Sequence, residues 1–253
     1  MDFFKKFLPG FKRPAVNCFM LFHKCGNNYS IDLHKHTKNI CYVSNVTIDT
    51  ADKINGLHRR DIANARCRNF DVETLRRHGI LTREDARFLV FTRHPASFVL
   101  SATKYHLRGD EKWARTTPQP HLGGRSLTDA LRAAGDEGER QIITMTHFAW
   151  LFERMVSFVP YFDDPRFKRL KVEDLFTTKD VSYYQDIASF LRLEGHSGFL
   201  DALKNASPAF KTDLPRHSTG TFRREGDPLE KLEAVARDHY MMNWQTYSDR
   251  LGY

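Results

Sequence analysis

The segment "FHKCGNNYS", residues 22 to 30, combines a positive charge with a turn and the start of a helical pattern. It ends the apolar run "CFMLFH" (18–23), which predicts a buried strand. In an open α/β sheet, ligands bind where strands give way to helices, and the first turn of a helix leaves N–H groups for an anion. Gly26 lets the backbone come close to such an anion, and Lys24 adds a full charge. We therefore predict a phosphate or sulfate site formed by Lys24, Cys25, Gly26, Asn27, Asn28 and Tyr29.

This turn differs from the Walker A loop of nucleoside triphosphatases. The pattern GxxxxGK[ST] is absent, and no Ser or Thr directly follows Lys24 to bind magnesium. Taken alone, a basic turn after a strand also fits a solvated loop, so the prediction depends on what other segments bring to the same place.

A second segment, "RHPASFVLS" (93–101), has a similar character. Arg93 ends the apolar run "RFLVFT" (87–92), a strong strand pattern, and Pro95 suits the first turn of the helix that follows. Ser101 lies in that helix. Arg93 and Ser101 can grip one phosphate between them. The alternative is an Arg salt bridge and a Ser bonded to its own helix.

A third segment, "STGTFRREGDP" (218–228), places glycines, two arginines and an aromatic residue in a loop late in the chain. Arg223 and Arg224 could clamp a phosphate, and Phe222 could stack on a base. Gly226 gives the loop its freedom to turn. A solvated charged loop is the alternative for this segment too.

In this order, the three segments resemble the cytosolic-type sulfotransferases that use 3′-phosphoadenosine 5′-phosphosulfate (PAPS). "HKCGNNY" is similar to the family's phosphosulfate loop, PKSGTTW, with Lys24 on the lysine, Gly26 on the glycine and Tyr29 on the tryptophan. "RHPASFVLS" fits the family's RxPxxxxxS motif for the 3′-phosphate through Arg93 and Ser101.

Two later motifs extend the resemblance over about residues 18 to 253. "LKVEDL" is similar to the family's YEDL strand end, with Val172 in place of the tyrosine. "FRREGDP" is similar to FxRKGxxGDW through Phe222, Arg224 and Gly226, but Glu225 replaces the lysine and the insert is shorter. The final "RLGY" looks like the family's tail.

The resemblance implies a PAPS-dependent sulfotransferase whose cofactor product is adenosine 3′,5′-bisphosphate (PAP). Lys24 would neutralise charge on the leaving bisphosphate, and the loop amides with Asn27 and Asn28 would hold the sulfonate. The resemblance also implies that the 3′-phosphate is held by Arg93, Ser101 and Arg224. The adenine ring would lie between Tyr29 and Phe222. No metal is expected, because no metal-ligand spacing stands out in the sequence.

The general base is the main departure from the family pattern. The family usually has a His or Glu at a strand end shortly before the Arg motif, but the segment here is "NARCRNFDVETL". Asp71 is its nearest carboxylate, followed by Glu73, and His58 lies earlier in "NGLHRRD". We favour Asp71 slightly over His58 as the base.

The elements needed to position these residues alternate along the chain. Further strand patterns lie at 41–48 and 65–70, and 167–175 predicts a strand and its exit. Helical patterns follow them and fill 181–193 and 228–252. This alternation predicts an α/β fold with a central parallel β-sheet flanked by helices on both faces, which the resemblance narrows to a P-loop-like sulfotransferase fold. Residues 109–125 are expected to form a long loop, with Ser126 as the N-cap of a short helix.

Length and composition predict one folded domain over 1–253, with an N-terminal arm at 1–16 and an acceptor-side insertion at 107–146. The chain has 41% hydrophobic and 13% aromatic residues, which excludes a disordered protein, and no apolar run long enough to span a bilayer. Its four cysteines are too few for a disulfide framework, so a cytoplasmic protein is expected.

The net charge of +8 predicts an anionic partner. A PAPS-dependent enzyme acting on a small-molecule or glycan acceptor accounts for it, with the hydroxyl or amine unidentified. The alternatives are a nucleotide kinase and a non-catalytic module that binds anions or nucleic acid. Nucleic acid is not the expected partner, because the basic residues are dispersed and no RNP or helix-turn-helix pattern occurs.

Overall fold

The computed structural model describes residues 16–38, 40, 43–48, 50, 52–55, 62–211 and 226–253. Within them, five parallel strands form one sheet in the order β2-β3-β1-β4-β5. The strands are β1 (Val16–Leu21), β2 (Val43–Ile48), β3 (Ile62–Arg68), β4 (Ala86–Thr92) and β5 (Phe167–Lys171). The predicted α/β class with a central parallel sheet is confirmed.

The middle of the sheet is apolar because both of its faces are covered. All six residues of β1 are buried, and β4 is buried at every position except Arg87. Such strands read as continuous apolar runs rather than alternating ones, which is why "CFMLFH" and "RFLVFT" could be recognised. Each predicted strand differs from the observed one by a few residues at its ends.

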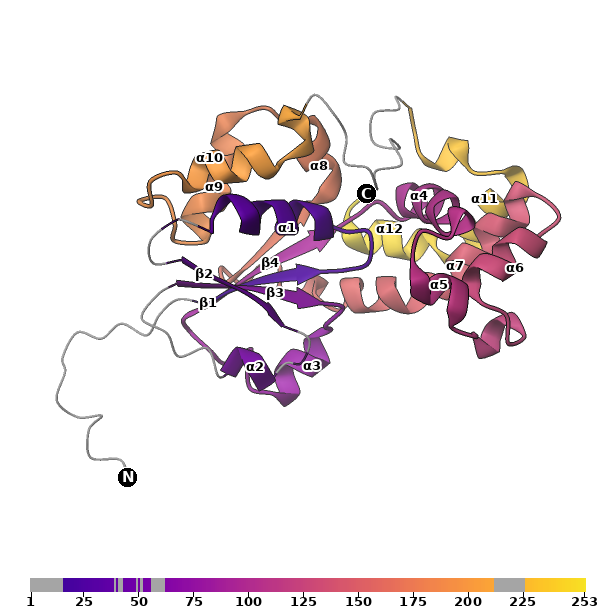
Figure 1. Cartoon of the computed structure of the whole chain (residues 1–253), viewed down its shortest axis with the longest axis horizontal. Coiled ribbons are helices and arrows are strands. Elements are labelled where there is room, and N and C mark those ends of the chain that lie inside the picture. The colour runs from indigo at the N-terminus through magenta and orange to yellow at the C-terminus, as the bar shows by residue number, and fades with distance from the viewer. Residues whose placement is uncertain are drawn as a thin grey trace.

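Helices lie on both faces of the sheet and beyond its carboxyl edge (Figure 1). One face carries α1 (Asn27–His36) with α8 (Val172–Thr177), α9 (Val181–Phe190) and α10 (Phe199–Ala206), and the other carries α2 (Asp52–Asn55) and α3 (Val72–Arg77). The remaining helices gather at one end of the molecule: α4 (Pro95–Arg108), α5 (Lys112–Thr116), α6 (Leu127–Ala133), α7 (Glu137–Val156), α11 (Ala234–Asn243) and α12 (Gln245–Leu251). Short 3₁₀ turns occupy Pro120–Leu122, Val159–Tyr161, Pro208–Phe210 and Leu229–Lys231.

Three features differ from the sequence expectations. Residues 109–125 are not one long loop, because α5 and the turn Pro120–Leu122 occupy much of the segment. No element is predicted for 137–156, where α7 runs for 20 residues with Asp136 as its N-cap. The expected helix at 228–252 is two helices, since Trp244 separates α11 from α12. Ser126 caps α6 as expected, accepting a hydrogen bond from the Asp129 N–H.

The strand order places the turn after β1 next to the turn after β4. The connection from β1 leads by α1 to β2 on one side, whereas β4 lies on the other side of β1 and leads on to β5. The carboxyl ends of β1 and β4 therefore flank the point where the connections diverge, which is where open α/β sheets bind ligands. Among the described residues, no helix has the length and apolar character needed to cross a bilayer.

Candidate active site

The turn between β1 and α1 contains one residue, Lys24, whose backbone conformation is unfavourable for its side chain. Lys24 has φ 59° and Gly26 has φ 76°. Gly tolerates the left-handed region, whereas a long side chain such as lysine adopts it at a cost of about 1–3 kcal/mol and only where the surroundings impose it. Gly26 is needed for a second reason: a Cβ there would lie 2.3 Å from Cδ1 of Phe91.

Arg93 binds the backbone of this turn. Its side chain is 2% exposed, and its Nη1 donates to the Lys24 carbonyl at 3.0 Å while Nη2 donates to the Ser97 carbonyl at 3.2 Å. Burial lowers the pKa of this guanidinium, but an arginine stays charged at any ordinary pH. A buried cation therefore links the end of β1 to the first turn of α4.

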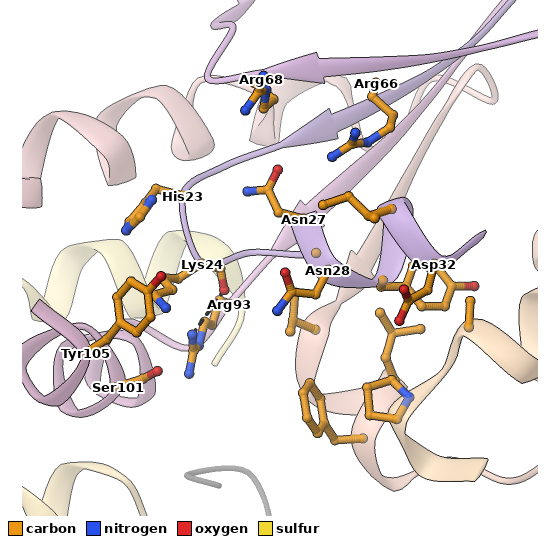
Figure 2. Close-up of a pocket in the computed structure, with 18 of the residues that line it drawn as sticks. His23, Lys24, Asn27, Asn28, Asp32, Arg66, Arg68, Arg93, Ser101 and Tyr105 are labelled. Atoms are coloured by element: carbon orange, nitrogen blue, oxygen red, sulfur yellow. Dashed lines mark hydrogen bonds between the residues drawn. The ribbon is translucent and has the colours of Figure 1, made fainter. Parts of the chain in front are cut away.

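A cavity of about 490 Å³ opens beside this link (Figure 2). Figure 2 shows Lys24, Arg93, Ser101 and Tyr105 grouped on one side, with Asn28 facing them from the start of α1. The other walls come from the end of β3, from α8 and from residues 206–211. The structure thus brings together, around one cavity, seven sequence-predicted residues: Lys24, Gly26, Asn27, Asn28, Tyr29, Arg93 and Ser101.

Lys24 sits in a poorly solvated position. Its Nζ lies 2.8 Å from the centroid of the Tyr105 ring. Burial lowers the pKa of Lys24 to about 7; the Glu111 carboxylate opposes this shift, and the charge of Arg93 adds to it. Because a bound anion favours the charged form of a lysine, an anionic ligand would restore its full charge.

The "VEDL" and "RLGY" motifs support the site from behind. Glu173 accepts a hydrogen bond from the His94 N–H at 3.0 Å and another from the Tyr253 hydroxyl at 3.2 Å. Tyr253 also lies 3.1 Å from the Thr92 hydroxyl. Burial raises the pKa of Glu173, against the opposing charge of Arg93. The last residue of the chain and α8 therefore fix the junction between β4 and α4.

Three residues that were predicted to contact the cofactor have side chains held by the core or by the backbone. Cys25 is buried outside the cavity lining, and burial raises the pKa of its thiol to about 12. Tyr29 is 4% exposed, packs 6.0 Å from the Phe91 ring and donates its hydroxyl to the Leu203 carbonyl, so most of its ring belongs to the core. Asn27 donates to the Phe22 carbonyl at 2.7 Å and closes the turn.

Asp71 does not lie where the expected base would be useful. Its carboxylate accepts from the Thr74 N–H at 2.6 Å as the N-cap of α3, and it is 3.9 Å from Arg154. Burial alone would raise the pKa of Asp71, but the hydrogen bond from Thr74 and the charge of Arg154 hold this pKa below its usual value. Asp71 is not among the residues that line the cavity. This placement gives Asp71 a structural role as the N-cap of α3, and the choice between it and His58 as the base stays a prediction.

Four other predicted residues lie outside the described part of the chain: His58, Phe222, Arg223 and Arg224. The same holds for all of the expected N-terminal arm except Val16. Gly226 is described, is exposed and has φ 95°, but it is not part of the cavity wall.

The sequence analysis missed cationic and aromatic groups in the cavity wall. Arg66 and Arg68 lie two apart on β3, a spacing that turns both side chains to one face of the strand. Arg66 Nε donates to the Ser30 hydroxyl at 2.8 Å. The alternation in "ARCR" could have revealed them. Tyr105 reaches the cavity from α4, and no local pattern marks it.

Comparison with known proteins adds the fold. No protein-family description and no curated sequence matches the chain. A solved structure, the mouse sulfotransferase SULT7A1 complexed with PAP, is similar to it with a TM-score of 0.58 and 11% sequence identity. The similarity covers 94% of this chain and 84% of the mouse one. The chain therefore has the fold of a sulfotransferase, an α/β fold with a five-stranded parallel sheet.

Proposed function

We propose that the protein is a sulfotransferase that moves the sulfuryl group from PAPS to a hydroxyl or amine of a small molecule or glycan. The observation that carries this proposal is the link between two distant motifs: Arg93 donates to the Lys24 carbonyl at 3.0 Å, and both side chains line one cavity with Ser101. The fold shared with a PAP-complexed sulfotransferase supports it.

Each half of the cavity suits one end of PAPS. Arg93 and Ser101 would hold the 3′-phosphate by charge-assisted hydrogen bonds, with Arg224 from the late loop as a third partner. The N-terminal turn of α1 has no acidic residue, so its N–H groups would hold the 5′-phosphosulfate. Lys24, on the same side of the cavity as Arg93, would neutralise charge on the bisphosphate as it leaves. PAPS would therefore be recognised from both ends.

The proton of the acceptor needs a destination. His58 stays a candidate base, because its position lies outside the described residues. Among the described residues, the side chains of His23 and Glu111 also face the cavity beside Lys24. The acceptor would enter on this side, where Tyr105 and Trp113 provide an apolar wall.

Transfer from PAPS tests the proposal directly. The purified protein is incubated with PAPS and a panel of phenols, alcohols, amines and oligosaccharides, and PAP release is followed. We expect acceptor-dependent release that Lys24→Ala abolishes while the circular dichroism spectrum is unchanged. Lys35→Ala, on the exposed side of α1, is the matched control and should retain full turnover. Turnover retained in Lys24→Ala would remove that lysine from the chemistry.

A further inference from the structure

Three potential metal ligands converge beside Lys24. They are His23 from the turn after β1, His106 from α4 and Glu111, the N-cap residue of α5. Nε2 of His23 lies 3.0 Å from Nε2 of His106 and 3.7 Å from Oε2 of Glu111. One ligand atom from each residue lies within 4.8 Å of the other two, which makes this the one such cluster in the described part of the chain.

The spacing fits one small cation. Zinc binds imidazole nitrogen and carboxylate oxygen at about 2.0–2.2 Å, so two ligands of a tetrahedral zinc ion lie about 3.4 Å apart. The distances from His23 to its two neighbours fall on either side of that value. All three ligand atoms lie within 4.8 Å of one another, and side-chain rotations would have to shorten the longest of these separations.

Besides the spacing, His106 gives a second indication of a bound group. The His106 ring is fully buried, and its Nδ1 has no hydrogen-bond partner, although Oε2 of Glu111 lies 3.8 Å away. An ion takes one nitrogen from each imidazole, so His106 would offer either Nε2, beside His23, or Nδ1, beside Glu111.

Neighbouring side chains hold the ligands in place. Trp113 Nε1 donates to Oε2 of Glu111 at 2.9 Å and so orients the carboxylate. The Phe148 ring stacks on both imidazoles, with centroids 5.3 Å from His23 and 5.4 Å from His106. Such outer partners are the usual support of a metal site, because they fix the orientation of each ligand before the ion arrives.

We propose that His23, His106 and Glu111 bind one divalent transition-metal ion, with zinc the best match, and that its fourth position opens into the cavity. Two imidazoles and one carboxylate with an open position form a donor set typical of catalytic rather than structural zinc. His23 and Glu111 line the cavity, whereas His106 lies behind them. The nearby charge of Lys24 opposes a second cation, so the affinity should be micromolar rather than that of a closed structural site.

A role in catalysis rests on the proposed function. An acceptor hydroxyl bound to zinc loses its proton to water near neutral pH. Its oxygen can then form a bond to the sulfur of PAPS, while the bond from sulfur to the 5′-phosphate oxygen breaks and that oxygen leaves with the electron pair. The ion would thus perform the task of the base that the end of β3 does not provide.

The experiment measures metal binding without turnover. Protein freed of metal by chelator dialysis is titrated with zinc in competition with a chromophoric chelator, and with Co²⁺ by visible absorption. We expect one equivalent of zinc, weakened more than tenfold by Glu111→Gln and by His23→Ala. Glu111→Gln keeps an oxygen for Trp113 and should fold normally. His121→Ala is the matched control, because His121 and His147 form a second histidine pair 3.0 Å apart without a carboxylate.

The outcomes separate this inference from the proposed function. No stoichiometric zinc binding, or equal weakening by Glu111→Gln and His121→Ala, would overturn the metal site. PAP binding is measured on the same variants by calorimetry. If zinc binds as expected and PAP does not bind, the metal site stands and the sulfotransferase proposal fails; the reverse result rejects only the metal site.

Discussion

The neighbouring strands β1 and β3 end side by side, but the residues that follow them have different roles. The turn after β1 directs the Lys24 side chain into the cavity, and Gly26 leaves the backbone there without a side chain. The end of β3 is used for support: the Asn69 side chain accepts from the His23 N–H at 3.2 Å, its own N–H donates to the Leu21 carbonyl at 2.8 Å, and Asp71 caps α3. Under the proposed function, the end of β1 carries the chemistry, and Asn69 and Asp71 at the end of β3 hold the neighbouring backbone in position.

Backbone dihedral angles also distinguish the end of β1 from the end of β3. Lys24 and Asn69 both have φ near 60°. Asparagine tolerates the left-handed region because its short side chain bonds locally, whereas lysine does not. Strain at Lys24 is thus a feature that the surroundings maintain, and the conformation of Asn69 is the ordinary one for a turn. Position at the carboxyl edge of a sheet is not sufficient to identify a catalytic group.

The largest effect is expected from adding a side-chain carbon to Gly26, in the turn after β1. Gly26→Ala should destabilise the protein by about 2–4 kcal/mol, because the new Cβ meets Phe91 in a conformation that alanine resists. Gly79→Ala is the matched control: Gly79 also has positive φ, at 67°, but a Cβ there meets nothing within 4 Å. Urea unfolding measures both. Equal losses would show that the packing against Phe91 is unimportant.

Arg93 should have the next largest effect, on ligand binding. Arg93→Ala should weaken PAP binding more than tenfold, about 1.4 kcal/mol or more, and change AMP binding little, because AMP lacks the 3′-phosphate. Arg87→Ala, near the start of the same strand, should leave both affinities unchanged. Calorimetry on folded variants is the measurement, and an unaltered dissociation constant for PAP in Arg93→Ala would break the assignment.

Asp71 should show the smallest effect, and only on stability. Asp71→Ala should lower the free energy of unfolding by about 1 kcal/mol, within about 0.5–2, because it removes an N-cap. Asp136→Ala, which removes the N-cap of α7, should cost a similar amount. PAP release during turnover should be unchanged in both. Loss of turnover in Asp71→Ala alone would return that carboxylate to the chemistry.

The sequence predicted the elements whose signals are local and continuous. The buried runs of β1 and β4, the glycine turn and the Arg-Pro motif each lie within about ten residues, so the cofactor side of the cavity could be predicted. The cluster of His23, His106 and Glu111 could not, because its members come together only when α4 and α5 fold over the turn after β1. Helix α7 was missed, although its capping residue Asp136 begins a long amphipathic segment.

Titration calorimetry of the unmodified protein with PAP and with AMP tests the central claim most directly. Two buried or strained cationic residues, Lys24 and Arg93, meet at the carboxyl ends of β1 and β4, and the account assigns one to each phosphate end of the cofactor. It predicts that PAP binds with one-to-one stoichiometry and at least tenfold more tightly than AMP. Equal affinities for the two nucleotides, or no binding of either, would contradict it.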